Sequence, residues 1–278
     1  MPTHEPTQPT PAGTATADAP ALEARNIERR FGAVVALSDA SIAIDHSEVL
    51  GLVGDNGAGK STLLKILSGA VVPDSGRILL DGEEADIRRP QDALDAGIET
   101  VYQDLALVDT MSAMQNIYLG REQLASSRIL SLFNVVNDRA MRKRASEIIE
   151  QLDVKIPSVT ANVKTMSGGQ RQSLAIARAI LWGRNIVILD EPTAALGVRE
   201  SRQVLNLIKG LRDHNVTVIV VSHNMQEIME VADRVTVMRL GRSIATRWVR
   251  DTTVEEVIGL ITGAVPGDRH DQQQGESG

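Results

Sequence analysis

One glycine-rich turn constrains the fold of this chain more than any other part of its sequence. It follows the apolar run Val49–Val53, precedes a helically spaced stretch at Ser61–Leu67, and reads Gly54, Asp55, Asn56, Gly57, Ala58, Gly59, Lys60, Ser61. This order fits the phosphate-binding pattern G-x-x-x-x-G-K-[ST] in full. Glycines let the backbone curve with its N–H groups pointing inward, and the following helix adds the positive end of its dipole. A chance glycine-rich turn is the weak alternative, because both the preceding strand and the following helix are predicted. We expect Lys60 to bind the β- and γ-phosphates of a nucleotide and Ser61 to bind Mg²⁺.

Further apolar runs predict the sheet around this turn. Ile186–Leu189 and Thr217–Val221 are continuous and rich in β-branched residues, as in strands that are buried on both faces. Val198–Arg212 lies between them and has helical periodicity. Strand, helix and strand in this order predict an α/β fold with a parallel sheet and right-handed crossovers.

An acidic pair ends the strand Ile186–Leu189. In open α/β folds ligands bind at the carboxyl edge of the sheet, where Asp190 and Glu191 are expected to lie. Asp190 would hold Mg²⁺ through water, and Glu191 would polarise an attacking water molecule. Taken alone, the pair could equally be an acidic helix cap after a strand.

A third motif carries a resemblance to a known family. Ser167, Gly168, Gly169 and Gln170 precede the helical stretch RQSLAIARAIL. With Met166, the motif reads MSGGQ and resembles the signature sequence of ABC (ATP-binding cassette) ATPases, in which leucine usually stands at the position of Met166. Methionine conserves the apolar bulk of leucine, so we expect little consequence. Serine and two glycines at a helix start form a second anion-binding end. In that family the signature faces the nucleotide of the partner subunit.

The resemblance assigns roles to further residues in sequence order. Phe31 resembles the aromatic residue that stacks on adenine, Gln103 the glutamine that senses Mg²⁺ and the γ-phosphate, and His223 the histidine that contacts the γ-phosphate. Phe31 could instead be a core phenylalanine, and a lone histidine after a strand is usually structural.

The ABC resemblance therefore implies three sets of residues. The catalytic set is Glu191, His223, Gln103 and Lys60. The metal set is Ser61, Gln103 and Asp190. The ATP-binding set is Phe31, Gly54, Asp55, Asn56, Gly57, Ala58, Gly59, Lys60, Ser61, Thr62, Ser167, Gly168, Gly169 and Gln170.

One position departs from the family pattern. After Glu191-Pro192-Thr193 the family usually reads S-A-L-D, whereas this chain has Ala194-Ala195-Leu196-Gly197. The missing aspartate normally helps the two subunits communicate. Gly197 leaves hydrolysis plausible and puts the coupling between the two sites in question.

The resemblance also implies how the chain is organised. We expect one P-loop NTPase domain over residues 21–265, with a mostly parallel sheet flanked by helices and an N-terminal antiparallel β subdomain. A helical subdomain is expected at about 104–170, where Asp138–Leu152 is the clearest amphipathic stretch. Residues 1–20 and 266–278 are expected to be disordered tails.

Composition excludes several functions. The net charge of -7 gives no support for nucleic-acid binding, and the absence of cysteine rules out disulfides and thiolate metal sites. No signal peptide and no apolar run long enough to span a bilayer are visible. We therefore expect any membrane process to be served from the cytoplasmic side through a partner.

The sequence around these motifs resembles one group of ABC ATPases in particular. Gly97–Glu122, Glu191–Ile208 and Ser222–Val235 are similar to ATPases of ribose-, xylose- and fructose-type importers, the last two to single-cassette fructose-type members. This implies a transport ATPase that works with ATP, Mg²⁺, a second copy of itself, a membrane permease and an extracytoplasmic solute-binding protein. The alternatives are a soluble ABC mechanochemical ATPase of DNA repair or translation and a nucleotide sensor that does not hydrolyse ATP. One cassette without cysteine disfavours the first, and Glu191 with His223 disfavours the second.

Overall fold

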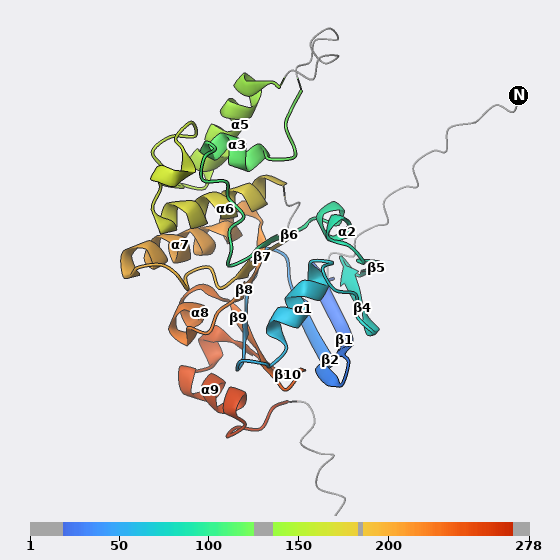
Figure 1. The fold of residues 1–278 in the computed structure, drawn as a ribbon. Coiled ribbons are helices and arrows are strands. Elements are labelled where there is room, and N and C mark those ends of the chain that lie inside the picture. Colours follow the sequence, from blue (N-terminus) through green and yellow to red (C-terminus); the bar gives the residue numbers. More distant parts are fainter. Residues whose placement is uncertain (1–18, 125–135, 183–185, 269–278) are drawn as a thin grey trace, which may run out of the picture.

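The apolar runs of the sequence form the centre of a six-stranded sheet. The computed structural model describes residues 19–268 except 125–135 and 183–185 (Figure 1). In the described chain the sheet has the order β10-β9-β3-β8-β7-β6. The strands are β3 (Val49–Val53), β6 (Ile98–Val101), β7 (Ile186–Asp190), β8 (Thr217–Val221), β9 (Arg234–Arg239) and β10 (Arg242–Trp248). All neighbours are parallel except β9 and β10, which confirms the predicted parallel sheet.

A second, antiparallel sheet packs beside the first. Its order is β2-β1-β4-β5, with β1 (Leu22–Phe31), β2 (Val34–Ile44), β4 (Ser75–Leu80) and β5 (Glu83–Ala85). Helix α1 (Lys60–Leu67) shares one apolar core with both sheets, because its buried face packs with Ile27 of β1 and Leu52 of β3. The predicted N-terminal antiparallel subdomain is thereby confirmed.

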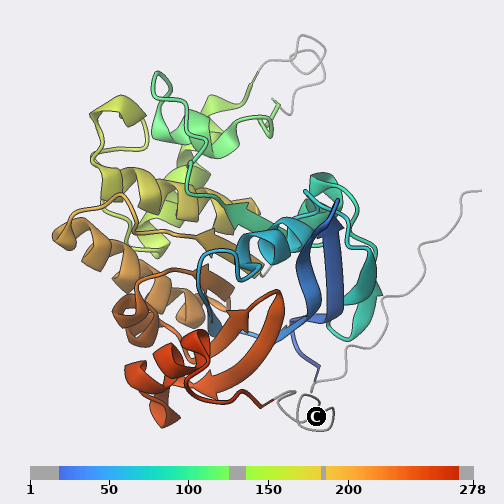
Figure 2. The ribbon, with the colours of Figure 1, turned by 60° about the horizontal axis from the view of Figure 1, so that its bottom comes forward.

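Helix α2 (Pro90–Asp95) joins the core of α1 through Ala93. The other helices cover the other face of the parallel sheet and extend beyond it (Figures 1 and 2). They share a second apolar core with that sheet. These helices are α3 (Ala113–Tyr118), α5 (Asp138–Gln151), α6 (Gly168–Trp182), α7 (Val198–Gly210), α8 (Met225–Val231) and α9 (Val254–Thr262), with short 3-10 helices at Val163–Thr165, Leu211–His214 and Val249–Asp251.

The segment between β6 and β7 is helical where it is described. Helix α5 begins where Asn137 accepts a hydrogen bond from the backbone of Ala140, at 3.1 Å. It packs on α3 and on α6, so this segment is attached to the sheet mainly through α6. The extent of the expected helical subdomain remains a prediction, since residues 125–135 lie outside the described chain.

The strand order determines where the functional residues lie. Strands β3, β8, β7 and β6 are neighbours and run in the same direction, so their carboxyl ends meet at one edge. The glycine-rich turn, His223, Glu191 and Gln103 follow these strands. Residues far apart in sequence are therefore collected at a single edge of the sheet.

The two ends of the chain fall mostly outside the described residues. The expected disorder of residues 1–18 and 269–278 concerns positions that the structure does not describe. Residues 266–268 are described, and the Asp268 N–H donates to the Ile244 carbonyl at 3.0 Å while its carboxylate pairs with Arg247 at 2.5 Å. Within the described ranges, none of the helices combines the length and apolar character needed to cross a bilayer.

Candidate functional site

The glycine-rich turn after β3 forms a loop that leads directly into α1. Gly54, Gly57 and Gly59 all have positive φ, and Gly59 is the N-cap residue of α1, at φ 103°. No side chain caps the first turn of α1 within the described chain, so its N–H groups are open to an anion. A Cβ added at Gly57 would meet nothing within 4 Å, and this part of the loop faces open space.

Two of these glycines are required by close contacts with neighbouring strands. A Cβ at Gly54 would lie 2.2 Å from the carbonyl oxygen of Met238, and one at Gly59 would lie 2.6 Å from a methyl group of Leu37. Both positions also have a backbone conformation that L side chains rarely adopt. The loop is therefore held between β2 and the end of β9 while its inner side stays open.

Lys60 extends back over the loop that precedes it. Its ammonium group donates to the carbonyl oxygens of Gly54, at 2.6 Å, and Asp55, at 3.0 Å. Burial lowers the pKa of Lys60, while the carboxylates of Glu191, Asp55 and Asp190 oppose that shift. A half-buried ammonium group at the mouth of an anion-binding loop is placed as a phosphate ligand requires.

The acidic pair at the end of β7 has two different environments. Burial, and then the neighbouring charge of Glu191, raise the pKa of Asp190, while Lys60 lowers it. Glu191 has the positive φ of 51°, and its N–H donates to the Val221 carbonyl at 2.9 Å. Because of this left-handed backbone conformation, the Glu191 side chain does not follow the alternating directions of the side chains in β7.

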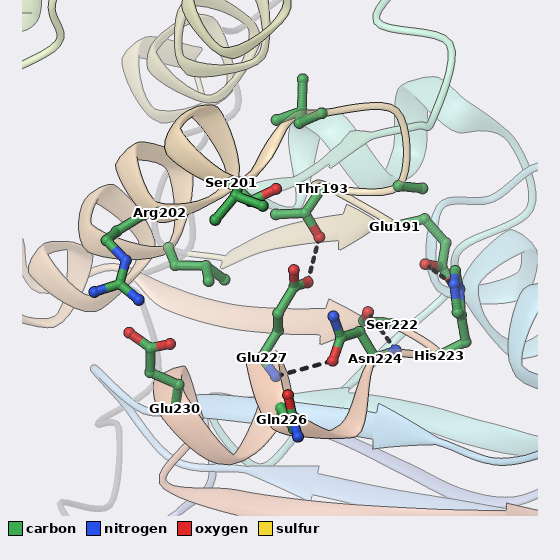
Figure 3. A pocket seen from close by; sticks show the side chains of 14 residues that line it. Glu191, Thr193, Ser201, Arg202, Ser222, His223, Asn224, Gln226, Glu227 and Glu230 are labelled. Carbon is green, nitrogen blue, oxygen red and sulfur yellow. Dashed lines mark hydrogen bonds and ion pairs between the residues drawn. The ribbon is translucent and has the colours of Figure 1, made fainter.

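Glu191 and His223 meet at the end of β7 and β8. Nδ1 of His223 lies 2.8 Å from Oε2 of Glu191 (Figure 3). The Glu191 side chain is 19% exposed and that of His223 is 72% exposed. Oε2 is buried and has no well-aligned hydrogen-bond donor among the described residues. Solvent therefore reaches Glu191 over the exposed part of its side chain, while Oε2 itself is enclosed beside His223.

A cavity of about 450 Å³ adjoins this pair, between α7 and α8 (Figure 3). At its wall the Thr193 hydroxyl donates to the carboxylate of Glu227, and the Glu227 N–H donates to the side chain of Asn224 at 3.4 Å. The Asn224 N–H in turn donates to the Ser222 hydroxyl at 3.0 Å. These bonds fix the backbone on both sides of His223.

Gln103 and Phe31 are both exposed. Gln103 follows β6 at the same edge of the sheet as Glu191. Phe31 ends β1 with 46% of its surface exposed, and the Arg29 guanidinium lies 4.9 Å from its ring centre. Phe31 is therefore no core residue, and Arg29 covers one face of its ring at the surface.

The signature motif begins α6, and its own side chains close the start of that helix. The Ser167 N–H donates to the Gln170 side chain at 3.0 Å, and the Gln170 N–H donates to the Ser167 hydroxyl at 3.4 Å. Gly168 and Gly169 allow α6 to approach α7, since Cβ atoms there would lie 2.9 Å from Leu196 and Glu200. Met166 is buried in the apolar core, as its bulk predicts.

Arg178 connects α6 to the segment that follows Gln103. Its guanidinium donates to the carbonyl oxygens of Leu105, at 2.8 Å, and Ala106, at 2.9 Å. Burial lowers the pKa of Arg178, and the carboxylate of Glu99 opposes this shift. The helix that carries the signature and the residues next to Gln103 are thus joined by one side chain.

Residues that we did not single out from the sequence include Arg178, Glu200 and the pair of Thr193 with Glu227. Glu200 stands three positions after Gly197, and an acidic residue at that position of a helix start is a recognisable capping signal. The contacts of Arg178 join positions that are distant in sequence, so no local pattern indicates them.

Comparison with known proteins identifies relatives over most of the chain. Residues 37–194 match the family model described as "ABC transporter". The fructose import ATP-binding protein FrcA of Rhizobium meliloti is 44% identical over 89% of this chain and 96% of its own length. The xylose/arabinose import ATP-binding protein XylG of Sulfolobus acidocaldarius is 40% identical over 88% of this chain and 95% of its own.

Solved structures share the fold. A nucleotide-free ATP-binding cassette from an ABC transporter superposes with a TM-score of 0.74, at 24% identity, over 87% of this chain and 95% of its own. A dimeric cassette in a post-hydrolysis state bound to ADP and Pi superposes with a TM-score of 0.67, at 24% identity, over 83% of this chain and 100% of its own.

Proposed function

This chain belongs to the ABC transporter family, and from that membership we propose that it is the ATP-hydrolysing subunit of an importer for a monosaccharide. The observation that carries the proposal is the 2.8 Å contact of Glu191 with His223 at the sheet edge that also bears the phosphate-binding loop. A carboxylate, an imidazole and an ammonium group are thereby gathered where a nucleotide phosphate would bind.

The residues at this edge divide the work of phosphoryl transfer. The loop from Gly54 to Ser61, together with Thr62, binds the phosphates through backbone N–H groups, and Lys60 exchanges its carbonyl bonds for phosphate oxygens. Glu191 orients and polarises the attacking water through its carboxylate, and His223 holds Glu191 and the γ-phosphate. Phe31 stacks on the adenine. Positioning and electrostatics supply most of the rate enhancement in such reactions.

The oxygen donors near Asp190 suit Mg²⁺. Ser61, Asp190 and Gln103 offer a hydroxyl, a carboxylate and an amide oxygen, which are hard ligands of the kind this ion prefers. The raised pKa of Asp190 also indicates a carboxylate that a nearby cation would stabilise in its charged form. Mg²⁺ would neutralise charge on the β- and γ-phosphates.

Two copies of the chain are needed for a complete site. Ser167, Gly168, Gly169 and Gln170 begin an exposed helix end that contributes to neither the loop nor the acidic pair of its own chain. In the proposed dimer this end binds the γ-phosphate of the ATP held by the other copy. Hydrolysis removes that shared ligand and lets the dimer open.

The relatives support the transport assignment over the two alternatives. Both curated relatives are named as import ATP-binding proteins for sugars and match this chain over nearly their whole length. We propose that the chain acts at the cytoplasmic side of the membrane, where the segment after Gln103 and the helical subdomain dock on a permease. An extracytoplasmic solute-binding protein would deliver the sugar, and no nucleic acid takes part.

The test uses Glu191→Gln protein locked with ATP and Mg²⁺ as bait for detergent-solubilised native membranes, with mass spectrometry of what is retained. A multi-spanning permease, retained with ATP and absent from Lys60→Ala controls, is the expected result. Retention of ribosomes or DNA-repair proteins without a permease would reject the transport function. An unmutated chain that binds ATP without releasing phosphate would instead favour the sensor.

A further inference from the structure

Glu191 has a backbone conformation that its surroundings must maintain. Its φ of 51° lies in the left-handed region, which a non-glycine residue keeps only where neighbouring contacts hold it. On the side of β8, the N–H of Glu191 donates to the Val221 carbonyl at 2.9 Å. On the other side, the Ala194 N–H donates to the Glu191 carbonyl at 3.3 Å, and the Thr193 hydroxyl donates to the carboxylate of Glu227. The side chain of Thr193 thus attaches the segment after Glu191 to α8.

The bond between Thr193 and Glu227 belongs to a closed ring of contacts (Figure 3). The N–H of Glu227 donates to the Asn224 side chain at 3.4 Å, and Asn224 directly follows His223 in the chain. Nδ1 of His223 lies 2.8 Å from Oε2 of Glu191. Thr193 stands two positions after Glu191, which completes the ring. The separation of the carboxylate from the imidazole therefore depends on each contact of this ring.

The parts of this ring differ in how firmly their surroundings hold them. The ring borders the cavity of about 450 Å³ between α7 and α8, so on that side it faces open space. The His223 side chain is 72% exposed, whereas only 6% of the surface of Thr193 is exposed. Pro192 is buried as well, and its own ring restricts its φ. A bond that fixes Thr193 therefore also restricts the backbone of Glu191 through the stiff residue between them.

We propose that Glu227 is a positioning residue for ATP hydrolysis, which keeps Glu191 turned toward His223 by holding Thr193. This inference rests on the proposed function, in which Glu191 and His223 act on the attacking water and the γ-phosphate. Glu227 acts through Thr193 and not through a contact of its own with the nucleotide. Without the bond, Glu191 can leave its left-handed conformation, and its carboxylate then moves away from the imidazole.

A second contact of α8 offers a matched comparison. The carboxylate of Glu230, on the same helix as Glu227, lies 2.9 Å from the ammonium group of Lys209 on α7. This ion pair also attaches α8 to its neighbour, but it lies outside the ring that contains His223. If the bond of Glu227 only stabilised the packing of α8, the loss of either contact would have similar effects.

The experiment compares Thr193→Val with Glu230→Gln. Valine has nearly the shape of threonine and no hydroxyl, so it cannot donate to Glu227, whereas Thr193→Ser keeps the hydroxyl and tests for rescue. Steady-state phosphate release gives kcat and KM, and a fluorescent ATP analogue measures binding to the monomer. The imidazole NMR resonances of His223, identified by their loss in His223→Gln, report on the ring in the absence of nucleotide.

Thr193→Val is expected to lower kcat about tenfold, since a small misplacement of a catalytic group is costly. KM and monomer binding should stay unchanged, because the phosphate-binding loop is intact. The His223 resonances should shift, while those of His46, which precedes β3 at the opposite edge of the sheet, should not. Thr193→Ser should restore most of the lost kcat, and Glu230→Gln should leave both kcat and the His223 resonances unchanged. If Thr193→Val does not fold, Glu227→Ala gives the same comparison.

Unchanged kcat in Thr193→Val, equal losses of kcat in Thr193→Val and Glu230→Gln, or His223 resonances that do not shift in Thr193→Val would each overturn the positioning role and leave the proposed function intact. A reference protein that binds ATP without releasing phosphate would instead overturn the proposed function and, with it, the role of Glu227 in hydrolysis.

Discussion

Two glycine-rich turns begin helices in this chain, and they use their backbone N–H groups in opposite ways. At α1 the N-cap is Gly59, no side chain caps the helix in the described chain, and Lys60 lies over the opening. At α6 the Gln170 N–H donates to the Ser167 hydroxyl, which caps the helix start. The first turn is prepared to receive an anion, whereas the second already has acceptors of its own.

The two turns also differ in the parts of the chain that their glycines approach. The glycines of the phosphate-binding loop touch β2 and the carbonyl of Met238, which belong to the sheets. The signature glycines approach Leu196 and Glu200, which follow Glu191 in the sequence. The comparison teaches that the first turn is held by the two sheets, while the second is attached to the segment that follows Glu191.

The largest effect is expected from Glu191→Gln. Loss of the carboxylate that orients water should lower kcat about a thousandfold. Affinity for ATP should be retained, because the phosphate-binding loop is unchanged. Steady-state phosphate release and equilibrium binding of a fluorescent ATP analogue measure the two quantities. Normal turnover would remove Glu191 from the catalytic role and break the link between the signature segment and hydrolysis.

Lys60→Ala should impair ATP binding by the glycine-rich turn before α1 and leave the turn before α6 unaffected. Removing charge-assisted bonds to the phosphates is expected to weaken ATP binding about a hundredfold. Isothermal titration calorimetry with the monomer measures this loss, and Lys65→Ala, one turn further along α1, is the control. Equal losses in both variants would mean that a general positive field, and not the placement of Lys60, binds the phosphates.

Ser167→Ala should impair only the function of the turn before α6, which is ATP-dependent dimerisation. Without the hydroxyl, ATP-dependent dimerisation in the Glu191→Gln background should weaken about tenfold, the effect of one bond to a charged acceptor. Monomer binding of ATP should stay unchanged. If monomer binding falls together with dimerisation, the signature acts within its own chain and the contrast between the two turns fails.

Phe31→Ala should have the smallest effect. Stacking of a base on an exposed ring contributes about 1–3 kcal/mol, so we expect ATP affinity to fall about tenfold. Phe31→Tyr preserves the ring and serves as the control. Binding of triphosphate without a base should be equal in all three proteins, and a loss there would place Phe31 on the phosphates.

Local patterns predicted the features that depend on a few consecutive residues. The phosphate-binding loop, the acidic pair and the core strands were placed correctly because each is a strand followed by its turn. The amphipathic pattern likewise located Asp138–Gln151 as a helix. The expected site residues remain predictions in their roles, although Glu191 and His223 do meet at one edge.

Features that depend on the meeting of distant segments could not be predicted in this way. The sequence did not reveal that Glu200 would approach Gly169, since that contact needs α6 and α7 to pack at their starts. The bulges in the pairing of β1 with β2 also escape any simple alternation of apolar residues. For Phe31, only the folded chain distinguishes a surface ring from a core side chain.

The bonds of the Arg178 guanidinium couple two segments in the evolution of the chain. Because it binds the carbonyls of Leu105 and Ala106 from the signature helix, a substitution that reshapes the segment after Gln103 alters the support of that helix as well. If the permease docks on this segment, as proposed above, selection for a new membrane partner acts at the same time on the helix that carries the signature. We expect second-site suppressors of mutations in residues 104–108 to arise on α6, and the two segments to change together as such chains diverge.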